Sequence, residues 1–460
     1  MERLTGQDRM SLPPDELGWP VDIGALAVLD GARLLDADDH LRIEDVREAI
    51  ARHLPRVPRF RQVLHIPHWG LGGPLWIDAP TFRLEDHVQA VPVPAPAGEA
   101  ELLDTVEKLR AGPLDRSRPL WRIWLLTGLP ERRVILYVRV HHAIADGTAG
   151  VATLGALFDA EPDPPLPPAP MWSPAPQPTF RELLRDNLRR RGRAIGTVLR
   201  VLARPGATAR RVQRAWPAAT VGLLGNRAPR SNLNRPIGRY RRLAVVRAGL
   251  EPVRRIAHTH GGKVNDVLLA AVAGGIRELL LSRGQPVDGL VLQGWVPVSL
   301  HSEEAGKAQG NQDAVMVVPL PIGEPDPIRR LKVIAADTRG RKQRTTSPGL
   351  NALPVGFLQR AAWHMVTRQR TANVSVTNVP GPHQQLFLAG APLLELIPVV
   401  PITGNFTLGV GALSYAGQLS LIAVADRDTC PDVQVFADGV RATLQTLAGE
   451  GLPAAAPPTR

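Results

Sequence analysis

His141-His142-Ala143-Ile144-Ala145-Asp146-Gly147 is a segment in which two adjacent histidines follow a run of alternating apolar residues. The run predicts a β-strand over residues 134–142, because successive side chains of a strand point to opposite faces. His142 would continue the apolar face, and His141 would lie on the other face with Arg139. A given substrate can therefore meet only one imidazole easily, and the pair makes a poor metal clamp. The apolar face consists of Val134, Leu136, Val138 and Val140.

The chemistry of this segment is compatible with general-base catalysis by His142. A free imidazole has a pKa of about 6.5, so it accepts a proton near neutral pH. An alcohol is a weak nucleophile until a base removes its proton, and a positioned base accelerates such a step roughly 10²–10⁴-fold. A His-His dipeptide at a strand end is more often structural than catalytic, so the dipeptide alone leaves both interpretations open. No third histidine or cysteine stands at ligand spacing, and we predict no metal site.

Asp146-Gly147 ends the segment and is predicted to form a tight turn, in which glycine supplies a positive φ. Asp146 is a candidate for holding the loop or the histidine in place. Gly147 is either a turn glycine or a point where the backbone approaches the substrate closely. The sequence contains no Gly-x-Ser-x-Gly elbow, Walker A loop or Gly-x-Gly-x-x-Gly fingerprint, which disfavours the reactions that those motifs support.

The composition is that of a globular protein of 460 residues, long enough for several domains. Its single cysteine, Cys430, allows no disulfide within the chain and predicts a reducing, cytoplasmic location. Charged residues occupy the N-terminus where a signal peptide would be apolar, and no apolar stretch approaches 18 residues. Aromatic residues make up only 4%, which argues against a stacking platform for single-stranded nucleic acid.

A connector and a basic segment divide the chain. Nine prolines between Glu161 and Phe180 exclude regular structure there. Residues 181–214 hold eleven arginines against two acidic residues, so this segment carries +9 of the net charge of +12. Interleaved leucines and valines predict one or two basic amphipathic helices, broken at Pro205-Gly206. A solvated helix face, a nucleic-acid surface and a membrane surface all remain open for it.

The flanking regions are both predicted as mixed α/β. We expect helices over Leu41–Leu54 and Asn265–Leu281, with Asn265 or Asp266 as the N-cap of the second. Further strands are predicted over residues 291–298, 314–320 and 419–425. The predicted domains are residues 1–160, a connector and basic segment over 161–230, and residues 231–460.

The histidine segment matches the HHxxxDG signature of thioester-dependent acyltransferases such as chloramphenicol acetyltransferase and peptide-synthetase condensation domains. Further blocks occur in the order found in one family, so the chain closely resembles the bacterial wax ester synthase/diacylglycerol acyltransferases along nearly its whole length. The chain departs from that family at Arg122, where an acidic residue is usual, and at Thr377, where serine is usual. The blocks are Trp19–Leu26, Val57–Gln62, Pro113–Trp121, Val264–Leu268, Val296–Leu300, Gly310–Gln312 and Thr377–Pro382.

The resemblance implies an α/β fold of two chloramphenicol-acetyltransferase-like halves with a tunnel between them. It implies that His142 is the essential second histidine of the motif, beside His141, and that Asp146 is mainly structural. Asn265 and Asp266 match a motif that affects activity, although a helix cap is as good an interpretation of them. Acyl-CoA and a lipid alcohol, either diacylglycerol or a long-chain alcohol, are the implied substrates, and no cofactor is implied.

Other expectations concern the transition state, the surface and competing functions. Asn378 is a candidate hydrogen-bond donor to the reaction's oxyanion, with loop stabilisation as the alternative.

Because the implied substrates are lipids, residues 181–214 favour peripheral contact with the inner face of the membrane or with lipid droplets, and no nucleic acid is expected. The competing functions are a condensation-type acyltransferase that uses carrier-bound thioesters, and a catalytically silent protein that binds lipid or nucleic acid.

Overall fold

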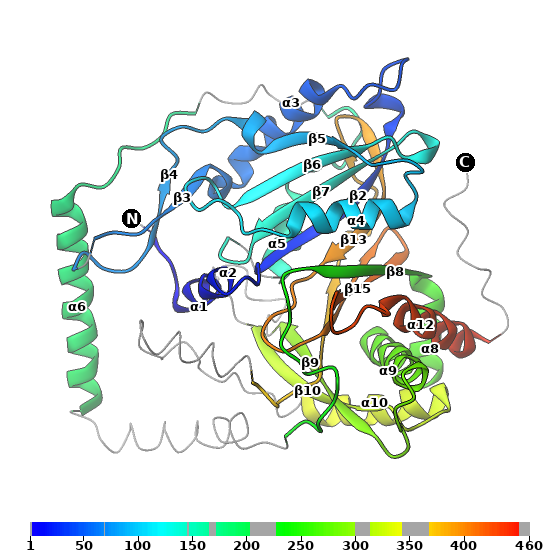
Figure 1. Cartoon of the computed structure of the whole chain (residues 1–460). Coiled ribbons are helices and arrows are strands. Elements are labelled where there is room, and N and C mark those ends of the chain that lie inside the picture. Colours follow the sequence, from blue (N-terminus) through cyan, green and yellow to red (C-terminus); the bar gives the residue numbers. More distant parts are fainter. Residues whose placement is uncertain are drawn as a thin grey trace.

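The fold is described from a computed structural model, which covers residues 2–68, 70–144, 147–164, 172–202, 227–299, 313–342 and 368–449. Two six-stranded sheets with flanking helices form its framework (Figure 1). A smaller third sheet has the order β1 (Glu2–Arg3), β4 (Leu75–Asp78) and β3 (Gln62–His65). The predicted mixed α/β class is therefore confirmed.

The first large sheet holds the predicted histidine strand near its centre, in the order β12-β13-β2-β7-β6-β5. The histidine strand is β7 (Arg133–His141), which runs antiparallel to both of its neighbours. The other strands are β2 (Asp22–Asp30), β6 (Trp121–Thr127), β5 (Val88–Pro92), β13 (Ala391–Val399) and β12 (Phe387–Leu388).

Strand β7 is buried on both faces, whereas the alternation had indicated one apolar face. The predicted apolar face packs with α3 (Ile43–His53) and α5 (Gly147–Gly155). The opposite face, on which Tyr137 lies, packs with α4 (Glu99–Arg110) and with side chains of the second large sheet. Because both faces are covered, Arg139 and His141 are buried polar residues that need internal partners.

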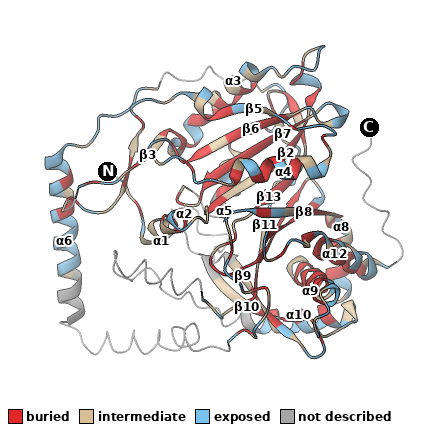
Figure 2. Ribbon diagram, viewed as in Figure 1, coloured by how far each residue is buried: buried red, intermediate tan, exposed pale blue. Residues whose placement is uncertain are grey.

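The second large sheet has the order β10-β9-β11-β14-β15-β8. Four helices supply the core on one of its faces, and α9 is apolar almost all round because it lies inside this layer (Figure 2). The strands are β8 (Arg241–Gly249), β9 (Val291–Ser299), β10 (Asp313–Pro321), β11 (Val374–Pro380), β14 (Leu408–Tyr415) and β15 (Gln418–Asp426). The helices are α8 (Leu250–Thr259), α9 (Val264–Ser282), α10 (Pro327–Lys342) and α12 (Val433–Ala448).

The chain crosses from the second sheet to the first and back at β12 and β13, residues 387–399, which we call the strand-exchange region. Although β12 and β13 come late in the chain, they complete the first sheet, where β13 pairs antiparallel with β2. Strand β13 also packs against β14 and β15 of the second sheet. A strand from the region 231–460 thus completes the sheet of the region 1–160, and the three-part division of the chain stays a prediction.

Most predicted elements occur with slightly different ends. Helix α3 confirms the predicted helix over Leu41–Leu54, and β9, β10 and β15 confirm the three predicted strands. The predicted N-cap of α9 is wrong, because Lys263 is the N-cap and Val264 begins the helix. Asp266 instead stands in the first turn and accepts a hydrogen bond from the Lys263 backbone N–H at 2.7 Å, as the acidic residue of a capping box does.

The basic segment begins with one long helix, α6 (Phe180–Leu202), which extends along the side of the molecule (Figure 1). The predicted break at Pro205-Gly206 lies outside the described residues. No helix among the described residues is long and apolar enough to cross a membrane. The remaining short helices are α1 (Gly6–Met10), α2 (Pro13–Glu16) and the 3-10 turns Gly31–Arg33, Leu54–Arg56, Pro58–Arg61, Leu84–Asp86 and Pro130–Arg132.

Candidate active site

The two histidines stand where β7 gives way to a turn. Strand β7 ends at His141, and residues 142–144 form the turn, so the predicted strand face of His142 is no longer defined by alternation. Backbone hydrogen bonds fix both residues: the His141 N–H donates to Leu120 O at 2.9 Å, and the His142 N–H donates to Val21 O at 3.0 Å. The position of the turn is therefore set by the strands on either side of β7.

His141 is held in one tautomer by two hydrogen bonds. Its Nδ1 accepts the backbone N–H of Ala143 at 3.0 Å, so this nitrogen carries no proton. Its Nε2 lies 3.1 Å from Oδ2 of Asp15 and donates to that carboxylate. The ring is fully buried. With its lone pair and its proton both engaged, His141 orders the turn and is not available to deprotonate a substrate.

Asp15, on α2, is a member of the site that the sequence did not predict. It is buried, and besides His141 it receives hydrogen bonds from Arg116 and from the Val21 backbone N–H. Burial alone raises the pKa of Asp15, but the hydrogen bond from His141 and the charge of Arg116 outweigh it and hold the pKa below its usual value. Asp15 and His141 are 126 residues apart, so no local pattern could have connected them.

His142 is the half-buried member of the pair. Its backbone is tied to Val21, while the neighbouring imidazole of His141 is committed to structure. The two residues therefore divide into His141, which is fully buried and enclosed, and His142, which is only half-buried.

A buried ion pair supports the end of β7 from the same face as His141. Arg139 donates to Asp22 with two nitrogens, and one of these contacts measures 2.7 Å. Asp22 is the residue of β2 that lies opposite His141 in the ladder. Arg139 also donates to the carbonyl groups of Leu109 and Gly112, at the end of α4. This arrangement ties three elements together within two residues of the histidine turn.

The Pro-Leu-Trp block, residues 119–121, belongs to the packing around the site. Leu120 and Trp121 are fully buried. Leu120 accepts the His141 N–H, and the indole N–H of Trp121 donates to Phe60 O at 2.8 Å. The block therefore supports the histidine strand without presenting a reactive group.

Helix α5 links the histidine turn to both sheets. It begins at Gly147, so the prediction that Gly147 completes a tight turn is wrong: the glycine is the first helical residue. Asp146 lies outside the described residues. α5 packs against β2 and β11, and a Cβ on Gly150 would overlap the side chain of Ile23. The start of α5 therefore stands at the junction of the two sheets.

The remaining candidates lie in the second sheet and its helices. Asp266 is buried, and its second oxygen accepts the Thr338 hydroxyl at 2.7 Å, so both of its oxygens serve structure. Asn265, beside it, is half-buried in the first turn of α9. Asn378 is half-buried on β11, the strand that α5 contacts. The structure thus places β11 against α5, the helix that follows the histidine turn, and assigns Asp266 to the first turn of its own helix.

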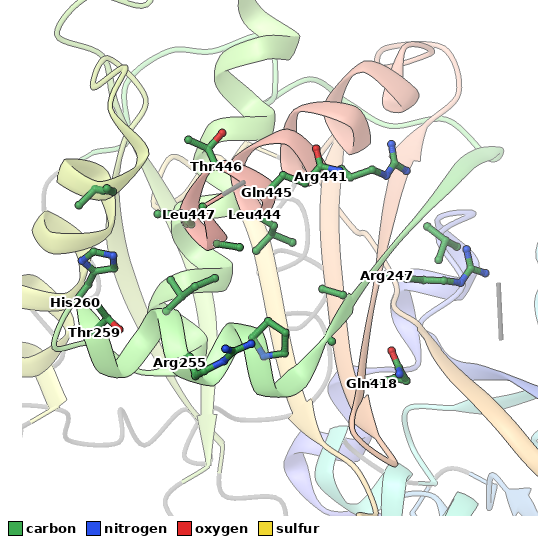
Figure 3. A pocket seen from close by; sticks show the side chains of 18 of the residues that line it. Arg247, Arg255, Thr259, His260, Gln418, Arg441, Leu444, Gln445, Thr446 and Leu447 are labelled. Carbon is green, nitrogen blue, oxygen red and sulfur yellow. The ribbon is translucent and has the colours of Figure 1, made fainter. Parts of the chain in front are cut away.

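Other features of the surface do not match this chemistry. Asp36, Asp38 and His40 form an exposed cluster, and Asp36 already accepts backbone N–H groups of its own loop. A cavity of about 1080 Å³ opens between β8, α8 and the end of α12, with Arg247, Arg255 and His260 around it (Figure 3). None of the predicted site residues lines that cavity.

Comparison with known proteins gives matches over both regions of the chain. Residues 4–268 match the wax ester synthase/diacylglycerol acyltransferase catalytic domain, and residues 309–448 match the WS/DGAT C-terminal domain. A putative diacylglycerol O-acyltransferase of Mycobacterium tuberculosis is 30% identical over 97% of this chain and 90% of its own length. The probable diacylglycerol O-acyltransferase tgs1 of the same species is 30% identical over 97% of this chain and 96% of its own.

Solved structures agree with these matches. The wax ester synthase/diacylglycerol acyltransferase from Marinobacter aquaeolei VT8 has a TM-score of 0.70 and 26% identity, over 97% of this chain and all of that one. The first condensation domain of the CDA synthetase has a TM-score of 0.59 and 16% identity, over 99% and 97% of the two chains. At that identity the second likeness concerns the fold alone, and it confirms the predicted acyltransferase-like arrangement of two α/β units.

Proposed function

Because the chain belongs to the wax ester synthase/diacylglycerol acyltransferase family, we propose that it transfers a fatty acyl group from acyl-CoA to a lipid alcohol. The acceptor is diacylglycerol, a long-chain alcohol, or both. The names of its relatives support these acceptors, and the tunnel predicted between the two halves would bring the two substrates together. His142 acts as the general base in this proposal.

One observation carries the role of His142, namely the internal engagement of its neighbour. His141 is fully buried. Its Nδ1 accepts a hydrogen bond from the Ala143 backbone N–H, and its Nε2 donates one to Asp15. His142 is half-buried in the turn that these bonds order. A general base needs an accessible imidazole in a fixed place. Because His141 is bound to internal partners and His142 is half-buried, His142 is the better candidate for the general base.

The reaction proceeds by direct transfer in this proposal. His142 removes the hydroxyl proton as the alcohol oxygen bonds to the thioester carbonyl carbon. The tetrahedral intermediate then collapses, the carbon–sulfur bond breaks, and coenzyme A leaves as a thiolate that takes the proton from His142. The products are an ester and free coenzyme A, and the base is regenerated without an acyl-enzyme.

Peripheral contact with a membrane or lipid droplet is a further part of the proposal, supported by α6. Four apolar side chains of this helix are exposed. They follow one another at intervals of four or seven residues, which places them along one side of the helix. Arginines alternate with them, and α6 is held to the body by Leu183 and Asn187 on another side. An apolar stripe beside cationic groups suits an anionic lipid surface. The stripe consists of Phe180, Leu184, Leu188 and Ile195.

The test is acceptor-dependent release of coenzyme A from palmitoyl-CoA by the purified protein, with diacylglycerol or hexadecanol. His142→Ala should lower kcat by at least roughly 10²-fold, because the base is removed. Arg83→Ala, an exposed residue away from the histidine turn, serves as the matched control and should leave kcat unchanged. Wild-type protein that releases no coenzyme A with either alcohol, yet accepts a carrier-bound thioester, would point to condensation-type chemistry instead.

A further inference from the structure

The cavity beside β8 opens onto the apolar core between the second sheet and its helices. Its volume of about 1080 Å³ is close to the upper end of the range of about 300–1,000 Å³ that small-molecule sites occupy. Four of its lining residues are buried members of that core, and Ile328 of α10 packs against them. An aliphatic chain in this cavity would therefore contact aliphatic side chains in place of water. The four residues are Ala248, Ile256, Leu444 and Leu447.

Two of the three arginines that line the cavity are balanced by acidic residues of the protein. Arg247 forms ion pairs with Glu99 at 2.5 Å and with Glu395 at 2.8 Å. Arg441 forms an ion pair with Asp438 at 2.5 Å. Neither arginine therefore brings an unbalanced charge to the cavity.

Arg255 of α8 is the third arginine, and its charge is not balanced. Within the described ranges of the chain, its guanidinium has no ion-pair or hydrogen-bond partner. The acidic residue of α8, Glu251, pairs with Arg254 at 3.8 Å. In Figure 3 the side chains of Leu444 and Leu447 stand above Arg255, on the opposite helix α12. The cavity thus combines one unbalanced cation with an aliphatic wall.

This combination favours an amphiphile with a single negative charge. The planar guanidinium of Arg255 matches the two oxygens of a carboxylate and binds them with two parallel hydrogen bonds. A phosphate monoester carries more than one negative charge near neutral pH, and a coenzyme A ester carries several, so one unbalanced arginine would leave part of their charge without a partner. A neutral lipid would make no ion pair with Arg255. The carboxylate of a long aliphatic chain fits both parts of the lining.

We propose that this cavity binds a long-chain carboxylate, with its carboxylate on Arg255 and its chain against Leu444 and Leu447. The inference does not depend on the acyl transfer proposed above. The histidine segment does not contribute to the lining, so this ligand binds at a second site, away from the histidine turn.

Photo-crosslinking locates the ligand and so separates this cavity from any other place where an aliphatic chain binds. The probe is dodecanoate with a diazirine group at the end of its chain, which reacts on illumination with whatever lies beside it. Full-length protein is labelled over a range of probe concentrations and digested, and the adducts are located by mass spectrometry. We expect adducts in residues 444–449 at the end of α12 and at Ile328, because these line the apolar part of the cavity.

Substitutions on α8 test the contribution of the charge. Arg255→Gln should raise the half-saturating probe concentration for the α12 adducts at least about tenfold, because it removes a hydrogen-bonded ion pair. Arg255→Lys keeps the charge without the fork and should lie between the two. Arg254→Gln, at the adjacent exposed residue outside the lining, is the matched control and should label as the wild type does. Ala448→Phe fills the cavity from α12 and should abolish the adducts, while thermal unfolding shows that each variant is folded.

Unlabelled competitors test the chemical class of the ligand. Dodecanoate should displace the probe from the cavity at a concentration at least about tenfold lower than dodecanol needs, and dodecyl phosphate should be no more effective than dodecanoate. Adducts that lie only outside the cavity, equal labelling of Arg255→Gln and the wild type, or equal displacement by dodecanol would overturn the proposal. Displacement by dodecyl phosphate at lower concentrations than dodecanoate would also overturn it, and would assign the cavity to phosphate monoesters.

Discussion

At the scale of single residues, His141 and His142 are distinguished by what surrounds them and not by their chemistry. Both imidazoles have the same intrinsic basicity. His141 gives both nitrogens to internal partners, whereas His142 stands half-buried in the turn that those partners fix. Asp15 is central to this difference, because it is the acceptor that holds the His141 ring.

Asp15→Asn tests this positioning role. The amide oxygen can still accept from His141 and Arg116, which share one oxygen of Asp15, but the NH₂ group then faces the Val21 backbone N–H, which is also a donor. We expect the free energy of unfolding to fall by about 1–3 kcal/mol, and kcat to fall by up to about 10²-fold through misplacement of the turn. Urea unfolding and coenzyme A release measure the two effects. Glu16→Gln, on the same helix and also paired with Arg116, is the control and should change neither by much.

The same carboxyl group predicts a pH dependence. The folded pKa of Asp15 lies below its ordinary value, so its stabilisation is present above the unfolded pKa of about 3.9 and is lost as the pH falls through the folded value. Wild-type protein should therefore lose stability more steeply than Asp15→Asn below about pH 4. Parallel curves of unfolding free energy against pH for the two proteins would contradict this assignment.

Residues with local signatures could be predicted from the sequence, and residues defined by distant contacts could not. The strand that ends at the histidines followed from its alternating apolar residues, but the exposure of His142 did not, because β7 ends at His141 and both of its faces are buried. Asp15 could not be predicted, since its partner is 126 residues away.

At the scale of elements, α6 combines an anchored side with an exposed apolar stripe. Leu183 packs with Leu71 and Leu75, and Asp186 forms an ion pair with Arg3 at 2.6 Å. These contacts hold the first half of α6 against the small sheet and leave its stripe uncovered (Figure 2). The helix therefore has a fixed orientation relative to the body, as a membrane-docking element requires.

Replacing Leu184, Leu188 and Ile195 together by glutamine tests the membrane contact that is proposed for α6. Burying one leucine is worth about 1.5–3 kcal/mol, so loss of three partly inserted side chains should weaken binding to phosphatidylcholine/phosphatidylglycerol vesicles by at least about tenfold. Vesicle sedimentation measures it. Arg185→Lys with Arg189→Lys keeps the charge and the stripe, and should bind nearly as wild type. Equal sedimentation of all three proteins would exclude this helix as the contact.

The predicted elements differ from the observed ones where a tertiary contact decides a boundary. The helix over Asn265–Leu281 was predicted from its apolar run, but its start is set by the capping bond between Asp266 and Lys263. Likewise, Gly147 was predicted as a turn residue, yet α5 begins there, and Gly150 of this helix packs closely on Ile23 of β2. The spacing of apolar residues and the composition predict that a helix or strand exists, whereas contacts with neighbouring residues determine where it begins and ends.

At the scale of the whole molecule, a buried polar cluster joins α4 to the second sheet. The Arg241 backbone N–H donates to Glu107 of α4, and the Arg241 side chain pairs with Asp426 at 3.3 Å. All three residues are buried, and burial raises the pKa of Glu107. Arg110 of the same helix donates to Val400 O, just beyond β13. Polar contacts thus join the two large sheets near the strand-exchange region.

Asp426→Ala should destabilise the entire fold. It leaves the Arg241 guanidinium buried without its carboxylate and also removes the acceptor for the backbone N–H groups of Gly238 and Thr429. Breaking a buried pair from one side costs about 3–5 kcal/mol, measured as the shift in urea unfolding. Asp428→Ala, two residues away and exposed, is the control and should shift it by less than about 0.5 kcal/mol. Similar shifts for the two variants would mean that the cluster contributes little.

The placement of β13 beside β2 has a consequence for biosynthesis. The edge of β2 that β13 covers has no partner until residues 391–399 leave the ribosome. At about 5–20 residues per second, the roughly 360 intervening residues take some 20–70 s to translate. During that time a nearly complete sheet carries an open hydrogen-bonding edge, which is a template for aggregation. During synthesis, the sheet that bears the histidines would therefore need protection by chaperones until β13 is made. A gene fragment that ends before codon 391 would encode this sheet without the strand that covers the edge of β2.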